Sequence, residues 1–258
     1  MINNKPRISL ITVVRNGEAT IAHCMASVLN QATQPFEYII IEGNSTDRTL
    51  EVIQEHSWPA VKVISEPDHG LYDAMNKGIN LASGDVIGLI NSDDVYADNQ
   101  VLRRVSDLFS DNPEISACYG DLCYVTCGGF TKIVRYWRSN PYKLGLFKKG
   151  WVPPHPTLYV RSEIYRKYGG FDLSYRIAAD FELMLRLFEI HHIRTAYIPE
   201  IMVEMCIGGT TNRNLKNIVL QNLEIRRALK NHSISSPLVG FIAHKCWSRF
   251  LQFIQRPQ

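Results

Sequence analysis

The stretch Val86-Ile87-Gly88-Leu89-Ile90-Asn91-Ser92-Asp93-Asp94 decides the predicted fold, because an apolar run of strand length ends abruptly on two adjacent carboxylates. An unbroken run of Val, Ile and Leu is typical of a strand buried on both faces, as in a parallel sheet. Two neighbouring carboxylates repel each other, so they need a cation or a positively charged ligand. Ligands of open α/β sheets bind at the carboxyl ends of the strands. The stretch therefore indicates a divalent cation that holds a diphosphate, or else an Asp that caps the following helix.

The rest of the N-terminal half predicts strands that alternate with helices. This pattern implies right-handed crossovers and a mostly parallel sheet flanked by helices, which is an α/β fold. Asn16, Glu42, Asp68 and Asp93 would then lie along one rim of the sheet. Strands are expected at 8–14, 38–41 and 61–64, and helices at 19–29, up to residue 55, and at 71–81.

Several short motifs extend this pattern along the chain. In order they are Thr12, Glu42-Gly43-Asn44-Ser45-Thr46-Asp47, Pro67-Asp68-x-Gly70-x-Tyr72-Asp73-Ala74-Met75-Asn76-Lys77-Gly78, Asn91-Ser92-Asp93-Asp94, His155-Pro156, Gly169-Gly170-Phe171-Asp172 and Ala179-Asp180-Phe181-Glu182. Together they resemble glycosyltransferase family 2 over residues 6–210. Two positions depart from the family's pattern: Glu42 stands where Asp is usual, and Asn91 stands where a first carboxylate often sits.

The resemblance implies a GT-A type fold and an inverting transfer of a sugar from a nucleotide-diphosphate donor, of the UDP type. It divides the chain into a glycosyltransferase domain at 1–210 and a C-terminal helical extension at 211–258. Within the domain, residues 6–98 would bind the nucleotide and residues 99–210 the acceptor. Enzymes that resemble this chain commonly build bacterial surface polysaccharides, so a glycan or lipid-linked acceptor is expected.

The donor site predicted from the resemblance draws on the sheet rim and the helix that follows it. Thr12 and Glu42 would face the ribose and base, where a carboxylate can accept hydrogen bonds. Simpler interpretations exist for Thr12 as a strand residue, for Asp68 as a turn residue, and for Asp73 and Lys77 as a solvated i,i+4 ion pair. The predicted donor-binding residues are Thr12, Asn16, Glu42, Asp68, Asp73, Asn76, Lys77, Asn91 and Asp93.

The metal site is predicted at Asp93 and Asp94. A bound Mg²⁺ or Mn²⁺ would bridge two phosphate oxygens and neutralise the charge that grows as the nucleotide leaves. Carboxylate and phosphate oxygens suit either metal, so the sequence does not choose between them.

Asp180 is the predicted catalytic base, because the family carries its acidic base at the start of a helix in this motif. The competing interpretation is a helix N-cap, for which Asp is favoured. Glu182 lies two residues further on and would point elsewhere on the helix.

Two further positions are predicted to contact the acceptor or the diphosphate. His155 lies between prolines in a rigid segment, and a buried structural histidine is the alternative. Thr210 lies in Gly208-Gly209-Thr210-Thr211, which could close over the diphosphate as a lid or simply connect to the next helix.

Composition fits a globular enzyme. The net charge of +3 is too small to indicate nucleic-acid binding, and 45% of the residues are hydrophobic. No signal peptide and no apolar run of transmembrane length is expected, which indicates a cytoplasmic protein. The six cysteines lack C-x-x-C pairs and are expected to be free thiols.

From Pro237 onward the sequence predicts a basic amphipathic helix. Its apolar stripe includes Trp247 and Phe250, opposite Lys245 and Arg249. Such a helix can lie at the inner face of the cytoplasmic membrane, or it can pack on the enzyme's own core or on a second subunit in a homo-oligomer.

Two other functions stay open from the sequence alone. One is a nucleotide-sugar-binding protein without turnover, because Asn91 weakens the metal motif. The other is a nucleotidyltransferase, although the chain has no basic Gly-rich loop near its N-terminus.

Overall fold

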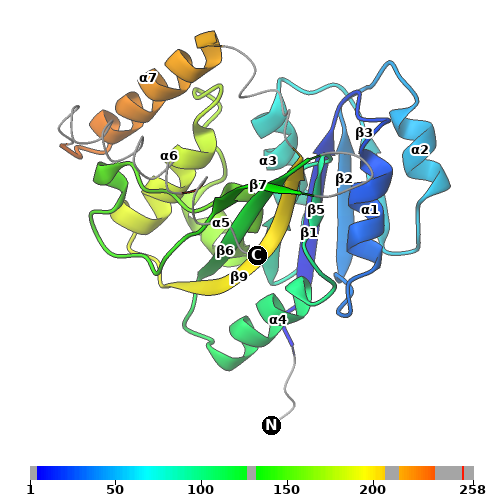
Figure 1. Ribbon diagram of the computed structural model, residues 1–258, viewed down its shortest axis with the longest axis horizontal. Coiled ribbons are helices and arrows are strands. Elements are labelled where there is room, and N and C mark those ends of the chain that lie inside the picture. The colour runs from blue at the N-terminus through cyan, green and yellow to red at the C-terminus, as the bar shows by residue number, and fades with distance from the viewer. Residues whose placement is uncertain (1–4, 127–131, 207–214, 236–251, 253–258) are drawn as a thin grey trace.

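The computed structural model describes residues 5–126, 132–206, 215–235 and 252 (Figure 1). Nine strands of this part of the chain form one sheet in the order β3-β2-β1-β4-β8-β6-β9-β5, with β7 paired to β6. The strands are β1 (Ile8–Val14), β2 (Glu37–Glu42), β3 (Val61–Ser65), β4 (Val86–Leu89), β5 (Asp94–Tyr96), β6 (Ala117–Val125), β7 (Ile133–Trp137), β8 (Tyr159–Arg161) and β9 (Thr195–Cys206).

The N-terminal half of the sheet is parallel, as the sequence predicts. Strands β3, β2, β1 and β4 pair in parallel, and β6 pairs with β9 in the same way. Strand β8 joins the two halves by antiparallel pairing with β4 and with β6. The predicted α/β class is confirmed, and the first strand has the predicted bounds.

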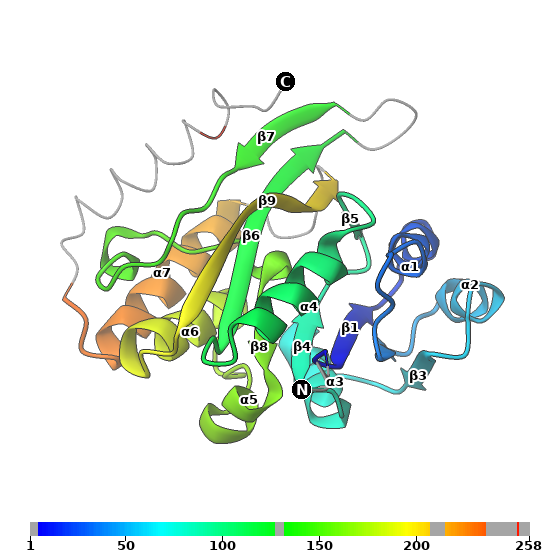
Figure 2. The same ribbon diagram turned by 90° about the horizontal axis from the view of Figure 1, so that it is seen from below.

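Helices cover both faces of the sheet (Figure 2). Helices α1, α2 and α4 contribute to the core on one face, while α3, α5 and α6 contribute to the other, with α7 packed on α6. The helices are α1 (Ile21–Leu29), α2 (Thr49–Glu55), α3 (Leu71–Leu81), α4 (Val101–Asp111), α5 (Ser162–Tyr168), α6 (Ala179–Leu185) and α7 (Leu215–Asn231), with short helical turns η1 (Phe147–Lys149), η2 (His155–Thr157) and η3 (Arg186–Ile190).

The side chains of β1 alternate between the two faces of the sheet, which explains why both faces of this strand are buried. Ile11 and Val13 belong to the core that contains α3, whereas Leu10 and Val14 belong to the core that contains α1. Successive side chains of a strand point to opposite faces, so one apolar run supplies both cores. Each fully buried side chain of this size contributes about 1.5–3 kcal/mol.

Gly78 brings α3 unusually close to β1. A Cβ atom at residue 78 would lie 2.5 Å from the Cγ2 atom of Ile11, which is too close for any real contact. The helix can therefore pack this tightly only with glycine at this position. This close packing fixes where the N-terminal end of α3, with Tyr72, meets the sheet rim.

The interpretation of Asp93 or Asp94 as a helix cap is wrong. Asp94 begins strand β5, which pairs antiparallel with β9, and the next helix, α4, begins only at Val101. The two carboxylates therefore lie at a strand-to-strand turn.

The beginning of the predicted C-terminal extension packs on the domain. Ile225, Ala228 and Leu229 of α7 belong to the same apolar core as α3 and α6. The amphipathic helix predicted from Pro237 lies outside the described residues except for Gln252, whose Oε1 accepts a 2.6 Å hydrogen bond from Arg135 Nε. In the described part of the chain, no helix combines the length and the apolarity needed to cross a membrane.

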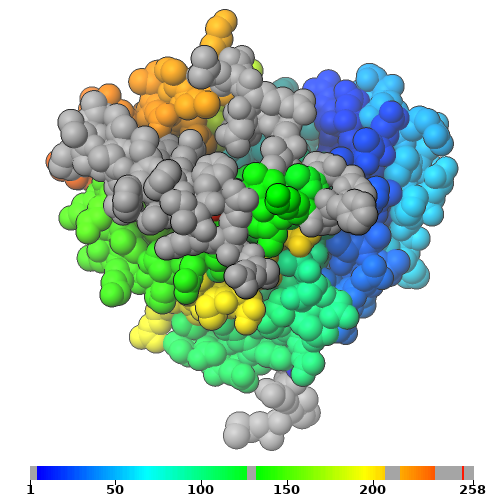
Figure 3. Space-filling model, in the orientation of Figure 1, coloured from blue at the N-terminus to red at the C-terminus, as the bar shows by residue number. Residues whose placement is uncertain are grey.

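The space-filling view places the two halves of the chain side by side on the surface. The N-terminal residues (blue and cyan) form one side and α7 (orange) lies on the other (Figure 3).

A buried carboxylate ties the N-terminal ends of the parallel strands together. Glu37, the first residue of β2, accepts hydrogen bonds from Ser9 Oγ at 2.6 Å and from the backbone N of Ser83 at 2.7 Å, and it pairs with Lys62. Burial alone would raise the pKa of Glu37, but these partners outweigh it and lower the pKa to about 2.

Glu37→Gln should destabilise the protein at pH 7 by about 1.5–3 kcal/mol, since it removes a charge that receives these bonds. A lowered pKa stabilises the fold above about pH 4.3, the ordinary value, and this stabilisation is lost as the pH falls toward 2. Urea unfolding of the wild type and of Glu37→Gln at pH 7 and pH 3 measures the difference between their free energies of unfolding. This difference should be smaller at pH 3. The exposed control Glu114→Gln should leave the free energy of unfolding unchanged at both pH values. An equal difference between the wild type and Glu37→Gln at pH 7 and pH 3 would contradict the lowered pKa of Glu37.

Candidate active site

The loops after β1 and β2 are joined at the sheet rim through Asn16. This residue has a positive φ of 54°, a conformation that Asn tolerates better than most residues. Its backbone N donates to Ser45 Oγ at 2.8 Å, and its Oδ1 accepts from the backbone N of Thr46 at 2.8 Å. The exposed Asn16 therefore shapes the rim loop, and its contact with a donor remains a prediction.

Glu42 lies at the carboxyl end of β2 but is almost completely buried. Its Oε1 accepts from the backbone N of Ser45 at 2.5 Å and its Oε2 accepts from Ser65 Oγ at 2.5 Å. Burial would raise the pKa of Glu42, yet these hydrogen bonds outweigh it and lower the pKa. Glu42 therefore stays ionised and fixes the loops after β2 and β3, so the structure gives no support for direct contact with a base.

Asp68 lies against the backbone of the same rim. A Cβ atom at Gly43 would lie 2.3 Å from Asp68 Oδ2, so the carboxylate approaches this backbone only because residue 43 is glycine. Asp68 Oδ1 also accepts from the backbone N of Gly70 at 2.9 Å, which is the predicted turn role. Asp68 is half-buried at the rim, where it can still reach a ligand.

The predicted donor contact of the Thr12 side chain is not supported, because this side chain is fully buried. Its Oγ1 lies 2.9 Å from the Tyr38 hydroxyl and donates to the carbonyl of Ile90 at 2.9 Å. The alternative of a strand residue inside the core describes Thr12 better.

Asp73 and Lys77 form the ion pair that their spacing predicts, with Lys77 Nζ 3.7 Å from Asp73 Oδ2. Lys77 also contacts Glu66 Oε1 at 2.8 Å, and Asp73 accepts from the backbone N of His69 at 3.0 Å. These contacts brace the loop that carries Asp68. The contact of Asp73 and Lys77 with a donor remains a prediction.

Both polar atoms of the Asn76 amide bond to the backbone of Phe171, and the predicted contact of Asn76 with a donor remains a prediction. Its Nδ2 donates to the carbonyl of Phe171 at 2.9 Å, and its Oδ1 accepts from the backbone N of Phe171 at 2.8 Å. A Cβ atom at Gly170 would lie 2.3 Å from Asn76 Oδ1. The amide therefore holds the Gly169–Asp172 loop against α3 through one donated and one accepted hydrogen bond.

Asp94 is a buried carboxylate with only one side-chain hydrogen-bond partner among the described residues. Asn91 Nδ2 donates to its Oδ2 at 2.8 Å, whereas its Oδ1 has no hydrogen-bond partner in the described residues. Burial, and then the charge of the exposed Asp93, raise the pKa of Asp94 well above its ordinary value. An unpartnered buried carboxylate beside a second one is an arrangement that a divalent cation would satisfy.

The protein alone offers too few ligands for a complete metal site. The described residues contain no group of three or more His, Cys, Asp or Glu side chains arranged to hold a metal ion. Asp93 and Asp94 therefore fit Mg²⁺ or Mn²⁺ only if a ligand such as a diphosphate supplies the remaining oxygens.

Asp180 lies in the first turn of α6, where it is half-buried. The N-cap residue is Ala178 and no side chain caps the helix, so the N-cap interpretation of Asp180 is wrong. Its Oδ1 lies 3.4 Å from the hydroxyl of Tyr72 and accepts from the backbone N of Phe181 at 2.8 Å. Its Oδ2 accepts no hydrogen bond from the described residues, so this oxygen can still take a proton.

Tyr72 is a site residue that the sequence analysis quoted in a motif but did not select. Its hydroxyl donates to the carbonyl of Ile177 at 2.8 Å, and the ring is buried at the start of α3. Tyr72 therefore connects the nucleotide-binding half to Asp180. Its place directly after the Asp68 loop was the available signal.

His155 is a buried histidine whose Nε2 has no hydrogen-bond partner in the part of the chain that the structure describes. Burial lowers the pKa of His155, while the nearby charge of Asp180 acts in the opposite direction. The enclosed Nε2 of His155 is a polar atom that a hydroxyl group reaching it would satisfy.

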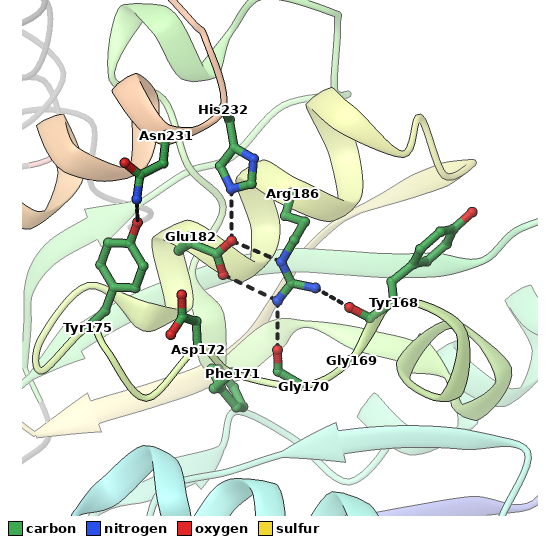
Figure 4. A pocket seen from close by; sticks show the side chains of 10 residues that line it. All are labelled: Tyr168, Gly169, Gly170, Phe171, Asp172, Tyr175, Glu182, Arg186, Asn231 and His232. Carbon is green, nitrogen blue, oxygen red and sulfur yellow. Dashed lines mark hydrogen bonds and ion pairs between the residues drawn. The ribbon is translucent and has the colours of Figure 1, made fainter.

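Glu182 does not share the environment of Asp180. Its carboxylate contacts Arg186 Nε at 2.9 Å and His232 Nε2 at 2.9 Å, between α6 and the residue that follows α7 (Figure 4). These three residues line a cavity of about 470 Å³, together with Asp172 and Tyr175. Because both oxygens of Glu182 are engaged, its predicted acceptor contact is not supported.

Thr210 and the rest of the predicted lid lie outside the described residues.

Comparisons with known proteins decide the family. The model of Glycosyl transferase family 2 matches residues 9–165. The chain belongs to this family. A "PGL/p-HBAD biosynthesis glycosyltransferase" of Mycobacterium bovis (strain BCG / Pasteur 1173P2) is 25% identical over 236 residues, which cover 87% of this chain and 86% of the relative.

Solved structures agree on the fold. S. aureus TarS 1-349 in complex with UDP-GlcNAc has a TM-score of 0.67 at 15% identity, covering 87% of this chain and 67% of that one. A mannosyltransferase from Pyrobaculum calidifontis in complex with GDP-Man and Mn2+ has a TM-score of 0.64 at 15% identity, covering 95% and 70%. The predicted GT-A fold of this family 2 glycosyltransferase is thereby confirmed.

The raised pKa of Asp94 should appear in the stability of the ligand-free protein. Such a group stabilises the fold below its unfolded pKa of about 3.9, and this is lost as the pH rises through the folded value. Asp94→Asn cannot titrate, so its stability relative to the wild type should improve between about pH 4 and pH 8. Urea unfolding of both proteins across this pH range measures the difference between their free energies of unfolding. Parallel pH curves for the wild type and Asp94→Asn would contradict the raised pKa, and the exposed control Asp111→Asn should follow the wild type.

Proposed function

We propose that this protein is an inverting glycosyltransferase that transfers a sugar from a nucleotide-diphosphate donor, of the UDP type, to a hydroxyl of a glycan or lipid-linked acceptor. The observation that carries the proposal is the place of Asp180. One oxygen of this carboxylate accepts no hydrogen bond from the described residues, and the carboxylate lies next to Tyr72 of the nucleotide-binding half and exerts its charge on His155.

The reaction needs one base. Direct displacement at the anomeric carbon inverts its configuration when a carboxylate takes the proton of the acceptor hydroxyl as that oxygen attacks. The nucleoside diphosphate leaves as an anion, so no second carboxylic acid is required, unlike glycoside hydrolysis. Asp180 fits the role of this base, whereas the carboxylate of Glu182 is paired with Arg186 and His232.

The donor is proposed to lie along the rim formed by the ends of β1 to β4. Asn16 and Asp68 offer polar groups there, and Asp93 is exposed for contact with the ribose or the phosphates. The TarS complex with UDP-GlcNAc and the mannosyltransferase complex with GDP-Man support a nucleotide sugar as the donor class. The choice of uracil rests on the family resemblance.

A divalent cation is proposed at Asp93 and Asp94. When bound, Mg²⁺ or Mn²⁺ would supply positive charge to the diphosphate leaving group. The buried Oδ1 of Asp94, which has no partner in the described residues, supports this assignment, and so does the Mn2+ in the mannosyltransferase structure.

The acceptor side is proposed to serve surface polysaccharide synthesis at the inner face of the cytoplasmic membrane. His155 would bind the acceptor hydroxyl through its unpaired nitrogen. Contact of the segment from Pro237 with the membrane is part of this proposal and rests on the sequence pattern alone.

Asp180→Asn should lower turnover by about 10²–10⁴-fold, because it removes the proton acceptor but keeps the shape of the side chain. Turnover is measured as UDP released from a panel of UDP-sugars with Mn²⁺, with water or a bacterial lipid fraction as the acceptor. Binding of UDP, measured by calorimetry, should change by less than about twofold. The matched variant Asp172→Asn should retain turnover.

Two outcomes would contradict this assignment. Normal turnover in folded Asp180→Asn would remove the base role. Release of sugar 1-phosphate rather than UDP from the UDP-sugar would indicate a nucleotidyltransferase.

The metal assignment predicts that UDP binds tightly only with the cation. Calorimetric titration of UDP with Mn²⁺ should give an affinity at least about tenfold higher than with EDTA, and Asp94→Asn should lose this gain. Because Asp94 must ionise to bind the cation, binding to the wild type should release a proton and weaken as the pH falls. Equal affinities under all three conditions would exclude a metal role for Asp94.

A further inference from the structure

Helix α7 lies beside α6 (Figure 1), and its side chains hold the residues just before Asp180 in place. We name residues 172–178 the base segment, because they lead directly into α6 and Asp180. Helix α7 packs on α6 through Ile225, Ala228 and Leu229. Its polar side chains contact the base segment along its length.

The strongest of these contacts comes from Glu224. Its Oε1 accepts from the backbone N of Arg176 at 2.9 Å, and its Oε2 accepts from Ile177 N at 2.8 Å and from Ala178 N at 2.9 Å. Glu224 is 7% exposed, so water has little access to compete for these bonds. Hydrogen bonds to an ionised carboxylate are roughly twice as strong as those between neutral groups.

The start of α6 needs such a partner. The first N–H groups of a helix have no acceptor inside the helix, and the N-cap residue Ala178 has no side-chain oxygen. Glu224, from a different helix, accepts from the backbone N–H of this N-cap residue and from the N–H groups of the two residues before it. The position at which α6 begins, and with it Asp180 in the first turn, therefore depends on α7.

Two further contacts from α7 reach the same segment. Arg227 Nη2 donates to the carbonyl of Ser174 at 2.6 Å, and its guanidinium lies 4.1 Å from the centre of the Tyr175 ring. Asn231 Nδ2 donates to the Tyr175 hydroxyl at 3.1 Å (Figure 4).

Ile177 is held from both sides. Its backbone N–H donates to Glu224 of α7, and its carbonyl accepts from the Tyr72 hydroxyl of α3 at 2.8 Å. The base segment is therefore fixed between helix α3 and helix α7.

We propose that Glu224 is a positioning residue for Asp180, acting through the backbone N–H groups of the base segment. The proposal rests on the proposed role of Asp180 as the base. Proton transfer requires a well-placed base, and a misplacement of about 1 Å can cost about 10²-fold in rate. The hydrogen bonds that Glu224 accepts from the described residues all come from the base segment and none from the proposed donor residues, so its loss should affect turnover and leave donor binding intact.

Glu224→Gln is the sharpest variant. The amide keeps one acceptor but places an N–H₂ group against backbone N–H donors, so at least one of the three hydrogen bonds is lost. We expect kcat for UDP release to fall about 10–10²-fold, while KM for the UDP-sugar and the calorimetric Kd for UDP with Mn²⁺ change by less than about twofold.

Glu189 offers a matched control elsewhere in the chain. It is 9% exposed, and its carboxylate also accepts from backbone N–H groups, those of Gly145 at 2.8 Å and Phe147 at 3.2 Å. Glu189→Gln should lower the midpoint of thermal unfolding about as much as Glu224→Gln does, yet keep kcat within about twofold of the wild type. Equal kcat values for the two variants would reduce Glu224 to a stabilising residue and overturn the proposal.

The double variant separates this proposal from the base assignment. If Glu224 acts through Asp180, Glu224→Gln should cause no further loss of kcat in an Asp180→Asn background. Normal kcat for Asp180→Asn would reject the base itself. A low kcat for Asp180→Asn with an unchanged kcat for Glu224→Gln would reject only the positioning role.

Arg227→Met serves if Glu224→Gln does not fold, since Arg227 is exposed and holds the same segment. It should lower kcat about 3–10-fold with an unchanged Kd for UDP and Mn²⁺. An unchanged kcat in this folded variant would overturn the proposal in that case.

Discussion

The paired hydrogen bonds between the Asn76 amide and the Phe171 backbone join the two halves of the chain, and the geometry of the site depends on them. Asn76 lies on α3, which Gly78 allows to pack directly on β1. The same helix begins beside Asp68 and carries Tyr72, which contacts the base segment. A single helix therefore relates the donor rim to Asp180, and a shift of α3 would move both together.

The chain uses its buried carboxylates in two different ways. Glu42 and Glu224 accept hydrogen bonds from backbone N–H groups and so fix loops, and their oxygens are saturated in the process. Asp94 and Asp180 each keep an oxygen that accepts nothing from the described residues. Hydrogen-bond saturation therefore separates carboxylates that shape the site from those that can take part in chemistry, which sequence motifs alone do not do.

Sequence periodicity was sufficient for the N-terminal half of the fold. β1 and α3 have the predicted bounds, because an unbroken apolar run of strand length and a helix-length segment between turn signals both reflect burial in the fold. Motif resemblance located Asp180 and His155 in the same neighbourhood.

The partners of individual side chains could not be predicted in this way. Asn76 was assigned to the donor, but its amide bonds to Phe171, 95 residues further along the chain. Glu224 carries no motif at all, and its three bonds reach 46 to 48 residues back. Such contacts depend on how the helices pack, and local patterns contain no information about them.

The sheet-rim residues and the residues that position Asp180 come from different parts of the chain. The family model matches residues 9–165, which contain the sheet rim with Asp93 and Asp94, whereas Asp180 and α7 lie beyond it. Because Glu224 reaches Asp180 only through backbone groups, the side chains of residues 172–178 are not required for this support. The buried Tyr175 side chain is nevertheless held by Arg227 and Asn231, so only the exposed side chains of this segment, such as those of Asp172 and Ser174, can vary while Asp180 keeps its place. Tyr72, in the first turn of α3, links the same segment to the sheet rim, so the relation between the rim and Asp180 does not depend on those exposed side chains.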